Sequence, residues 1–137
     1  MKFTVEINKF DESKKKEIIV ADVRVGKAMN GHKGLVHGGV ISLLFDETFS
    51  FVHEAIPLEQ IAKNQYTSNG NDSGETIVTA NLNVTYKKTL PAASDIVIRV
   101  YHEKNEGRKI YLYARMENRD GSMLYSDANV LFVVINK

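Results

Sequence analysis

Two glycines and two acids stand within one short, mostly apolar stretch of the sequence, GLVHGGVISLLFDETFSFV, which covers residues 34–52. The apolar part predicts a helix that is buried on nearly every side. Buried helices avoid carboxylates, because an unpaired charge removed from water is costly. Asp46 and Glu47 are therefore candidate acids or bases. The alternatives are a structural acid that is hydrogen-bonded across a dimer interface and a helix that is less buried than its apolar residues indicate. They lie about 100° apart around a helix, so only one can face a given site, and the spacing does not decide which.

The start of this helix has the features of a site for a developing oxyanion. The first backbone N–H groups of a helix have no partner within the helix and lie at the positive end of its dipole. Gly38 and Gly39 carry no side chain, so another molecule can approach these N–H groups closely. The alternative is that the glycines only let the turn pack on a sheet. His37, directly before them, either orients the loop or hydrogen-bonds a substrate.

The distance between the acid and the glycines predicts an assembly. Asp46 lies seven or eight residues beyond them, which is about 10 to 12 Å along a helix axis. One small reacting group cannot reach both ends of that span, so the two ends must come from different chains if both take part. Two helices packed antiparallel across a two-fold axis would bring Asp46 of one copy near Gly39 of the other. We therefore expect a homodimer with composite sites, with a dimer of dimers left open.

One helix and a set of strands must position these residues. The helix is expected to start near Gly38 or Gly39 and to run to about Glu54. Residues 58–74 form a long polar connection, which is expected to be a lid or an insertion. Strand-like runs, separated by turn-rich sequence, lie on both sides of these two segments. The runs cover residues 3–7, 17–25, 76–88, 95–104, 109–118 and 122–136.

The first run after the connection alternates between apolar and polar residues. One side is expected to carry Val78, Ala80, Leu82, Val84 and Tyr86, and the other Ile77, Thr79, Asn81, Asn83 and Thr85. Consecutive strands joined by short turns pair in antiparallel fashion. Five or six such strands with one enclosed helix predict an α+β hot-dog fold, in which a curved sheet wraps around one long central helix.

The composition narrows the class of protein. The 137 residues are expected to form one domain, residues 1–137. The absence of cysteine excludes a disulfide framework, a thiolate metal site and a cysteine nucleophile. A net charge of +1 gives no indication of a nucleic-acid partner, and no apolar run predicts an integral membrane contact. No spacing of histidines suits a metal site. No targeting segment is visible in the sequence, and the expected compartment is the cytoplasm or the mitochondrion.

Three blocks of sequence together carry a resemblance. They are GHKGLVHGGVISLLFDET, VTANLNVTYKKTLP and EGRKIYLYARMENRDGSMLYSDANVLFVVI, in this order between about Gly31 and Ile135. The chain resembles the hot-dog acyl-coenzyme A thioesterases of the PaaI-like group, especially the animal branch called thioesterase superfamily members. The resemblance implies hydrolysis of fatty acyl-CoA, of medium to long chain, to fatty acid and CoA. It implies no cofactor, because coenzyme A is part of the substrate.

The resemblance also implies roles for individual residues. The catalytic acid of the family stands nine residues after the motif histidine, and counting from His37 gives Asp46 rather than Glu47. Asp46 would be the general base or the nucleophile. The N–H of Gly38 or Gly39 would polarise the thioester carbonyl.

Further positions follow from the same resemblance. Thr79 matches a strand hydroxyl that helps to place the water, in agreement with its predicted position on the polar side of its strand. The positions expected to bind the substrate or its CoA phosphates are Asn81, Asn83, Lys87, Lys88, Arg108 and Lys109. Many members carry an asparagine where this chain has Gly31, beside Asn30, which weakens the expectation of a carbonyl-binding amide. Two alternatives stay open: a hot-dog dehydratase of hydroxyacyl thioesters that uses His37 with Asp46, and a non-catalytic acyl-CoA-binding or partner-regulating protein.

Overall fold

A computed structural model of the chain describes residues 2–7, 17–26, 30–32, 34–56 and 75–136. The connection at residues 58–74, which was predicted to be a lid or an insertion, lies outside the described residues. No helix in the described ranges is long and apolar enough to cross a membrane.

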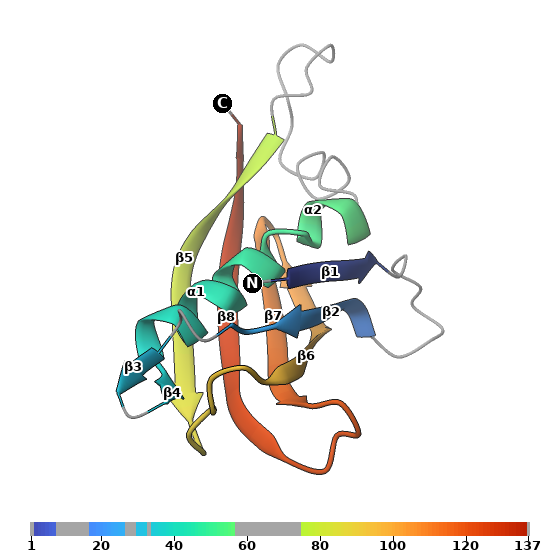
Figure 1. Ribbon diagram of the computed structural model, residues 1–137. Helices are drawn as coiled ribbons and strands as arrows, with labels where there is room; N and C mark the ends of the chain where they lie inside the picture. The colour runs from blue at the N-terminus through green and yellow to red at the C-terminus, as the bar shows by residue number, and fades with distance from the viewer. Residues whose placement is uncertain (1, 8–16, 27–29, 33, 57–74, 137) are drawn as a thin grey trace.

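Most of the molecule is one antiparallel sheet (Figure 1). Its strands are β1 (Lys2–Ile7), β2 (Glu17–Arg24), β5 (Glu75–Tyr86), β6 (Asp95–Glu106), β7 (Lys109–Asn118) and β8 (Leu124–Asn136). The order across the sheet is β1-β2-β6-β7-β8-β5, so β1 and β5 are its edges. The sheet confirms that the predicted strands are antiparallel and that β6 pairs with β7 and β7 with β8. The expected pairing of β5 with β6 is wrong, because β5 pairs with β8 and β6 pairs with β2. A short ribbon of β3 (Asn30–His32) and β4 (Leu35–Val36), which was not predicted, stands beside it.

Helix α1 (Gly38–Phe49) lies against one face of this sheet (Figure 1). Its buried side includes Leu44, Phe45 and Phe49, and the ring of Phe49 meets that of Phe132 in β8 edge-on at 6.3 Å. Every second side chain of β7 is buried on this face for most of the strand, so the helix and one face of the sheet supply the core. Burying one such side chain stabilises the fold by about 1.5–3 kcal/mol. The arrangement confirms the predicted hot-dog fold.

The helix starts where predicted and ends earlier. A separate helical turn, α2 (Val52–Ala55), follows α1 in place of one unbroken helix. The hydroxyl of Ser50 donates to the carbonyl of Glu47 at 2.6 Å, and Nδ1 of His53 lies 2.7 Å from the carbonyl of Ser50. Bonds from side chains to nearby backbone compete with the regular helical ladder. We attribute the division of the predicted helix to these contacts.

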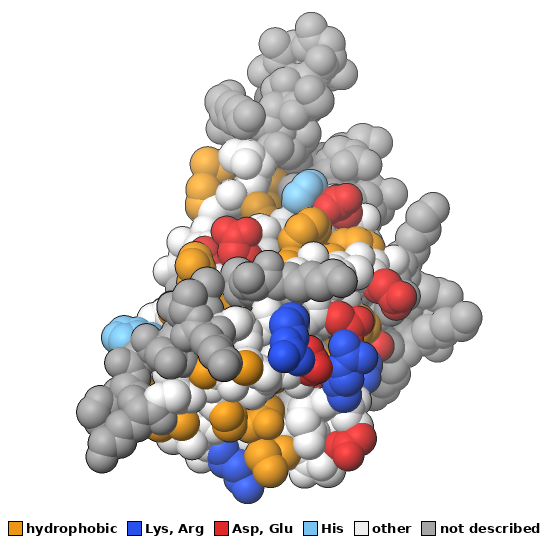
Figure 2. Space-filling view, in the orientation of Figure 1, with side chains coloured by type: hydrophobic (Ala, Val, Ile, Leu, Met, Phe, Trp, Pro, Cys, Tyr) orange, Lys and Arg blue, Asp and Glu red, His pale blue; other side chains and the backbone are white. Residues whose placement is uncertain are grey.

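One side of α1 is open to solvent in the single chain. Leu43 is 56% exposed, and Glu47 and Ser50, which follow it on the same side, are exposed as well. The prediction of a helix enclosed on nearly every side is therefore wrong for the chain alone, because the sheet covers only one side. The open side of α1 thus carries one large apolar side chain beside polar ones, and Figure 2 shows hydrophobic, acidic and basic side chains together on this face of the molecule.

Edge strand β5 carries a β-bulge at Ala80. Thr79 pairs with Phe132 and Asn81 pairs with Leu131, so Ala80 has no partner of its own across the pair. Directly opposed residues project from the same face of a sheet. Since Phe132 is in the core, Thr79 projects toward the helix side, whereas Asn81 projects from the outer face.

The bulge corrects the predicted alternation of β5. Ile77, Leu82 and Val84 all pack against the core, although Ile77 was predicted on the side opposite to the other two. Val78, predicted to share their side, is 43% exposed. One extra residue reverses the faces of all residues before it. Thr79 was therefore wrongly predicted on the side opposite to Leu82.

Candidate active site

The side chain of His37 caps the start of α1. Its backbone is extended (φ −63°, ψ 139°), and its Nδ1 accepts a hydrogen bond from the N–H of Gly39 at 2.9 Å. A Cβ on residue 39 would lie 3.2 Å from this Nδ1, which is tighter than ordinary contact, so glycine leaves room for the cap. His37 thus orients the first turn of the helix.

The cap distinguishes the two candidate oxyanion donors. The N–H of Gly39 is engaged by His37, whereas the N–H of Gly38 donates to no described residue. The carbonyl of His37 belongs to the same peptide unit as the Gly38 N–H, and it accepts from Val40 at 3.0 Å and Ile41 at 3.2 Å. Hydrogen bonds at one end of a peptide unit polarise it and strengthen the donor at its other end. Gly38 therefore presents a polarised, unengaged N–H at the positive end of the helix.

Tyr86, the last residue of β5, was not among the predicted site residues. Its hydroxyl donates to the carbonyl of Gly38 at 3.0 Å and lies 2.6 Å from Oγ of Ser42. A Cβ on residue 38 would meet the tyrosine ring at 3.6 Å, an ordinary contact. The alternation of the sequence predicted Tyr86 on the same side of its strand as Leu82. This position, at the end of a series of residues that face the core, could have indicated that Tyr86 lies near the helix.

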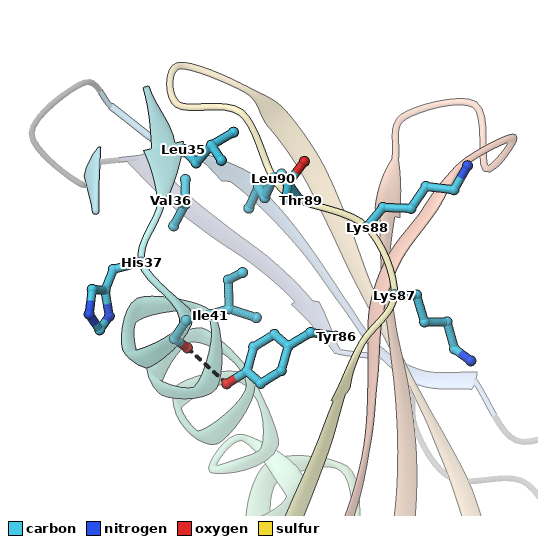
Figure 3. Close-up of a pocket in the computed structure, with 10 residues that line it drawn as sticks. Leu35, Val36, His37, Ile41, Tyr86, Lys87, Lys88, Thr89 and Leu90 are labelled. Carbon is cyan, nitrogen blue, oxygen red and sulfur yellow. Dashed lines mark hydrogen bonds between the residues drawn. The ribbon is translucent and has the colours of Figure 1, made fainter. Parts of the chain in front are cut away.

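A pocket of about 460 Å³ opens beside the start of α1 (Figure 3). The residues that line it are Leu35, Val36, His37, Gly38, Ile41, Tyr86, Lys87, Lys88, Thr89 and Leu90. Its wall is fixed where the N–H of Val36 donates to the carbonyl of Leu90 at 2.8 Å. Lys87 and Lys88 lie across the pocket from His37 (Figure 3). Four predicted site residues thus line this pocket, namely His37, Gly38, Lys87 and Lys88, and the side chains of both lysines point away from His37 (Figure 3).

Asp46 lies in the middle of α1, away from the lining of this pocket. It is partly exposed, and its carboxylate forms no hydrogen bond or ion pair with a described residue. Asp46 is the eighth residue after Gly38, which is a span of about 12 Å along the helix. A single chain therefore does not bring this acid to the unengaged N–H. Glu47, its neighbour, is exposed.

The predicted residues of β5 divide between the two faces of the sheet. Thr79 is exposed on the helix side, as its pairing requires. Asn81 and Asn83 are exposed on the outer face, where Asn83 stands opposite Asn129 of β8. The structure therefore does not bring the two asparagines to the start of α1.

Arg108 and Lys109 lie at the other end of the sheet from the two pocket lysines. The carbonyl of Arg108 accepts from the N–H of Val134, and Val134 pairs with Ile77 near the start of β5, whereas the pocket adjoins the end of that strand. Nε and Nη2 of Arg108 are buried without a hydrogen-bond partner among the described residues. Arg108 as a whole is partly exposed, so its guanidinium is a candidate to meet an anion.

No group of three or more His, Asp or Glu side chains that could hold a metal ion occurs among the described residues. The departure noted at Gly31 falls in β3, where only the backbone is described.

The chain is similar in sequence to curated acyl-coenzyme A thioesterases. The chain is 32% identical to acyl-coenzyme A thioesterase THEM4 of Mus musculus over 111 residues, which cover 81% of the chain and 40% of that protein. It is 27% identical to acyl-coenzyme A thioesterase THEM5 of Homo sapiens over 124 residues, which cover 90% of the chain and 42% of that protein. The chain thus spans less than half the length of these relatives.

Solved structures share the fold. A hypothetical thioesterase protein from Streptococcus pneumoniae TIGR4, solved with coenzyme A, superposes with a TM-score of 0.74 at 15% identity and covers 99% of the chain and 90% of its own. The protein smu.793 from Streptococcus mutans UA159, bound to acetyl CoA, gives a TM-score of 0.72 at 15% identity and covers 100% and 91%. Residues 33–125 match the family model described as Thioesterase superfamily, which is well over half of the chain. The chain therefore belongs to the thioesterase superfamily.

Proposed function

We propose that this protein hydrolyses acyl-CoA thioesters. The observation that carries the proposal is the unengaged, polarised N–H of Gly38 in a pocket whose far side holds Lys87 and Lys88. Such an N–H suits a developing oxyanion, and the lysines suit the phosphates of coenzyme A. The curated relatives are acyl-coenzyme A thioesterases, and structural neighbours were solved with coenzyme A or acetyl CoA, which supports this substrate class.

In the proposed reaction the thioester carbonyl oxygen accepts the N–H of Gly38. Asp46 takes a proton from a water molecule, which adds to the carbonyl carbon, and the oxyanion forms at the start of α1. The C–S bond then breaks, and the leaving thiolate takes the proton held by Asp46, which gives the fatty acid and the thiol of coenzyme A. General-base help of this kind contributes about 10²–10⁴ in rate. In the alternative, the carboxylate of Asp46 attacks directly and displaces the thiolate of coenzyme A to form an anhydride with the acyl group, and water then hydrolyses this anhydride to the same fatty acid.

The separation of Asp46 from Gly38 makes the proposed site a composite of two chains. A second copy could pack on two features of this surface. They are Leu43 on the open side of α1 and the outer edge of β5, which carries the exposed Val78. An antiparallel pairing across a two-fold axis would place Asp46 of one copy near Gly38 of the other and form two identical sites. It would also bring the Arg108 end of one sheet toward the pocket lysines of the other copy.

The test is thiol release from a series of acyl-CoA chain lengths by the wild type and two variants. Asp46→Asn removes the base, and Glu47→Gln is its matched control on the same helix. We expect Asp46→Asn to lose about 10²–10⁴ of the turnover and Glu47→Gln to stay within about twofold. Medium to long fatty acyl chains are the expected substrates. Tight acyl-CoA binding by the wild type without thiol release, or formation of an enoyl product, would contradict the proposal.

Gly38→Pro tests the oxyanion donor separately. Proline removes the N–H and adds a ring, and it is favoured at the first position of a helix. A Cβ at residue 38 would lie 3.6 Å from the ring of Tyr86, an ordinary contact. The extended backbone of His37 is the conformation that a residue before proline prefers. We expect the variant to fold as the wild type does and to lose about 10²–10³ in kcat. Near wild-type turnover would exclude Gly38 as the donor.

A further inference from the structure

The peptide unit between Gly38 and Gly39 is held at both of its polar ends. Its N–H donates to Nδ1 of His37 at 2.9 Å, and its carbonyl accepts from the hydroxyl of Tyr86 at 3.0 Å (Figure 3). The first contact comes from the residue before the helix and the second from the end of β5. This peptide unit directly follows the one that carries the unengaged N–H of Gly38.

We propose that Tyr86 is a positioning residue that fixes the direction of the Gly38 N–H. The inference rests on the proposed function, because it concerns the donor for the thioester oxyanion. A peptide unit fixed at its carbonyl and its N–H cannot rotate, so the neighbouring unit is held in its helical direction as well. A donor of this kind acts through its preorganised direction toward the place where charge develops.

Tyr86 is itself held in place from its other side. Its hydroxyl carries one hydrogen, which it donates to the carbonyl of Gly38, so the hydroxyl of Ser42 donates to the oxygen of Tyr86 across 2.6 Å. Ser42 stands one turn along α1 from Gly38. The tyrosine therefore ties the first turn of the helix to the end of the edge strand at two points.

Tyr86 also lies against the place where a substrate would sit. It lines the pocket, and its ring is within ordinary contact of a Cβ built on Gly38. Tyr86 is 52% exposed, so the phenol is held by its hydroxyl contacts and not by complete burial. Removal of the hydroxyl alone should loosen the clamp and leave the core unchanged.

The experiment compares Tyr86→Phe with Tyr111→Phe in the full chain. Tyr111 lies on β7, and its hydroxyl contacts only Glu106 at 3.4 Å among the described residues, so it is a matched control. For Tyr86→Phe we expect kcat to fall about tenfold with KM within about twofold, because misdirection affects the transition state more than ground-state binding. Tyr111→Phe should keep wild-type kcat and KM, and the melting temperatures should match.

Three outcomes would overturn the inference. They are a kcat for Tyr86→Phe within about twofold of wild type, a rise in KM with unchanged kcat, and a fall in kcat that Tyr111→Phe reproduces. Ser42→Ala should lose less kcat than Tyr86→Phe, because the bond from Tyr86 to Gly38 remains, and a larger loss would also count against the clamp.

A second measurement is independent of turnover. In ¹H–¹⁵N correlation spectra the amide signals of Gly38 and Gly39 should shift in Tyr86→Phe and stay in place in Tyr111→Phe. Unchanged glycine signals in Tyr86→Phe would overturn the clamp. If the wild type released no thiol, the proposed function would fail while these spectra still decided the role of Tyr86.

Discussion

At the scale of single residues, the start of α1 divides its tasks among neighbours that look equivalent in the sequence. Gly39 gives its N–H to the cap, and Gly38 keeps its N–H unengaged. The histidine of the motif serves the protein by accepting a hydrogen bond. The order His-Gly-Gly therefore leaves one donor for a ligand and uses the other to fix the helix.

The cap predicts a stability effect that is separate from catalysis. Replacing an N-cap side chain by alanine costs about 1 kcal/mol, so we expect His37→Ala to lower the free energy of unfolding by this amount. Asparagine is a favoured N-cap residue, so His37→Asn should restore most of the loss. Urea unfolding monitored by circular dichroism measures both. Equal stability of His37→Ala and the wild type would show that the cap contributes nothing.

At the scale of elements, β5 decides which side chains face the helix. Its bulge at Ala80 turns Thr79 toward α1, and its last residue, Tyr86, contacts the first turn of that helix. β5 is at the edge of the sheet, so among the described strands only β8 pairs with it. One strand thus contributes a hydroxyl on the helix side and the proposed clamp of the oxyanion donor, and the two lysines of the pocket follow it.

The bulge predicts that two threonines of β5 differ in function. Thr79 projects toward the helix, and Thr85, which pairs with Asp127, projects from the outer face. We expect Thr79→Val to lower thiol release about tenfold, because a hydroxyl that orients the water is lost. Thr85→Val is the control of identical chemistry and should remain near wild type. Equal effects of the two substitutions would contradict the assigned faces.

Local pattern and turn residues predicted the strands, their antiparallel sense and the start of the helix. They did not predict the order across the sheet, in which β5 pairs with β8 and not with the following strand β6. Periodicity could not predict the bulge, since one unpaired residue leaves the apolar pattern almost unchanged and is visible only in the pairing with β8. The early end of α1 depends on contacts of Ser50 and His53 with backbone, and the role of Tyr86 depends on a contact between residues 48 positions apart. Such contacts leave no periodic signal.

At the scale of the whole molecule, the single chain keeps the two parts of the proposed site apart. The unengaged N–H lies at one end of α1, Asp46 lies about 12 Å along it, and Arg108 is at the far end of the sheet. The open side of α1 and the edge of β5 adjoin these parts. We therefore expect that the second copy that completes the proposed site also covers the exposed edge of β5.

Complementation between two inactive variants tests this expectation. A hybrid dimer of Asp46→Asn with Gly38→Pro would contain one site with both residues intact. After the two are unfolded, mixed equally and refolded, half of the dimers are hybrids with one of two sites active, so about a quarter of wild-type turnover should return. A mixture no more active than its parents would exclude composite sites, as would a fully active monomer by light scattering.

The hydrogen bond from Gly39 to His37 also fixes the tautomer of the imidazole. Nδ1 accepts an N–H, so the neutral ring carries its proton on Nε2. The free nitrogen of this ring is thus a donor and has no lone pair to offer. While the cap is formed, His37 cannot remove a proton from a substrate carbon, as a dehydratase would require of it. It can only give a hydrogen bond, which a carbonyl oxygen or a departing thiolate can accept.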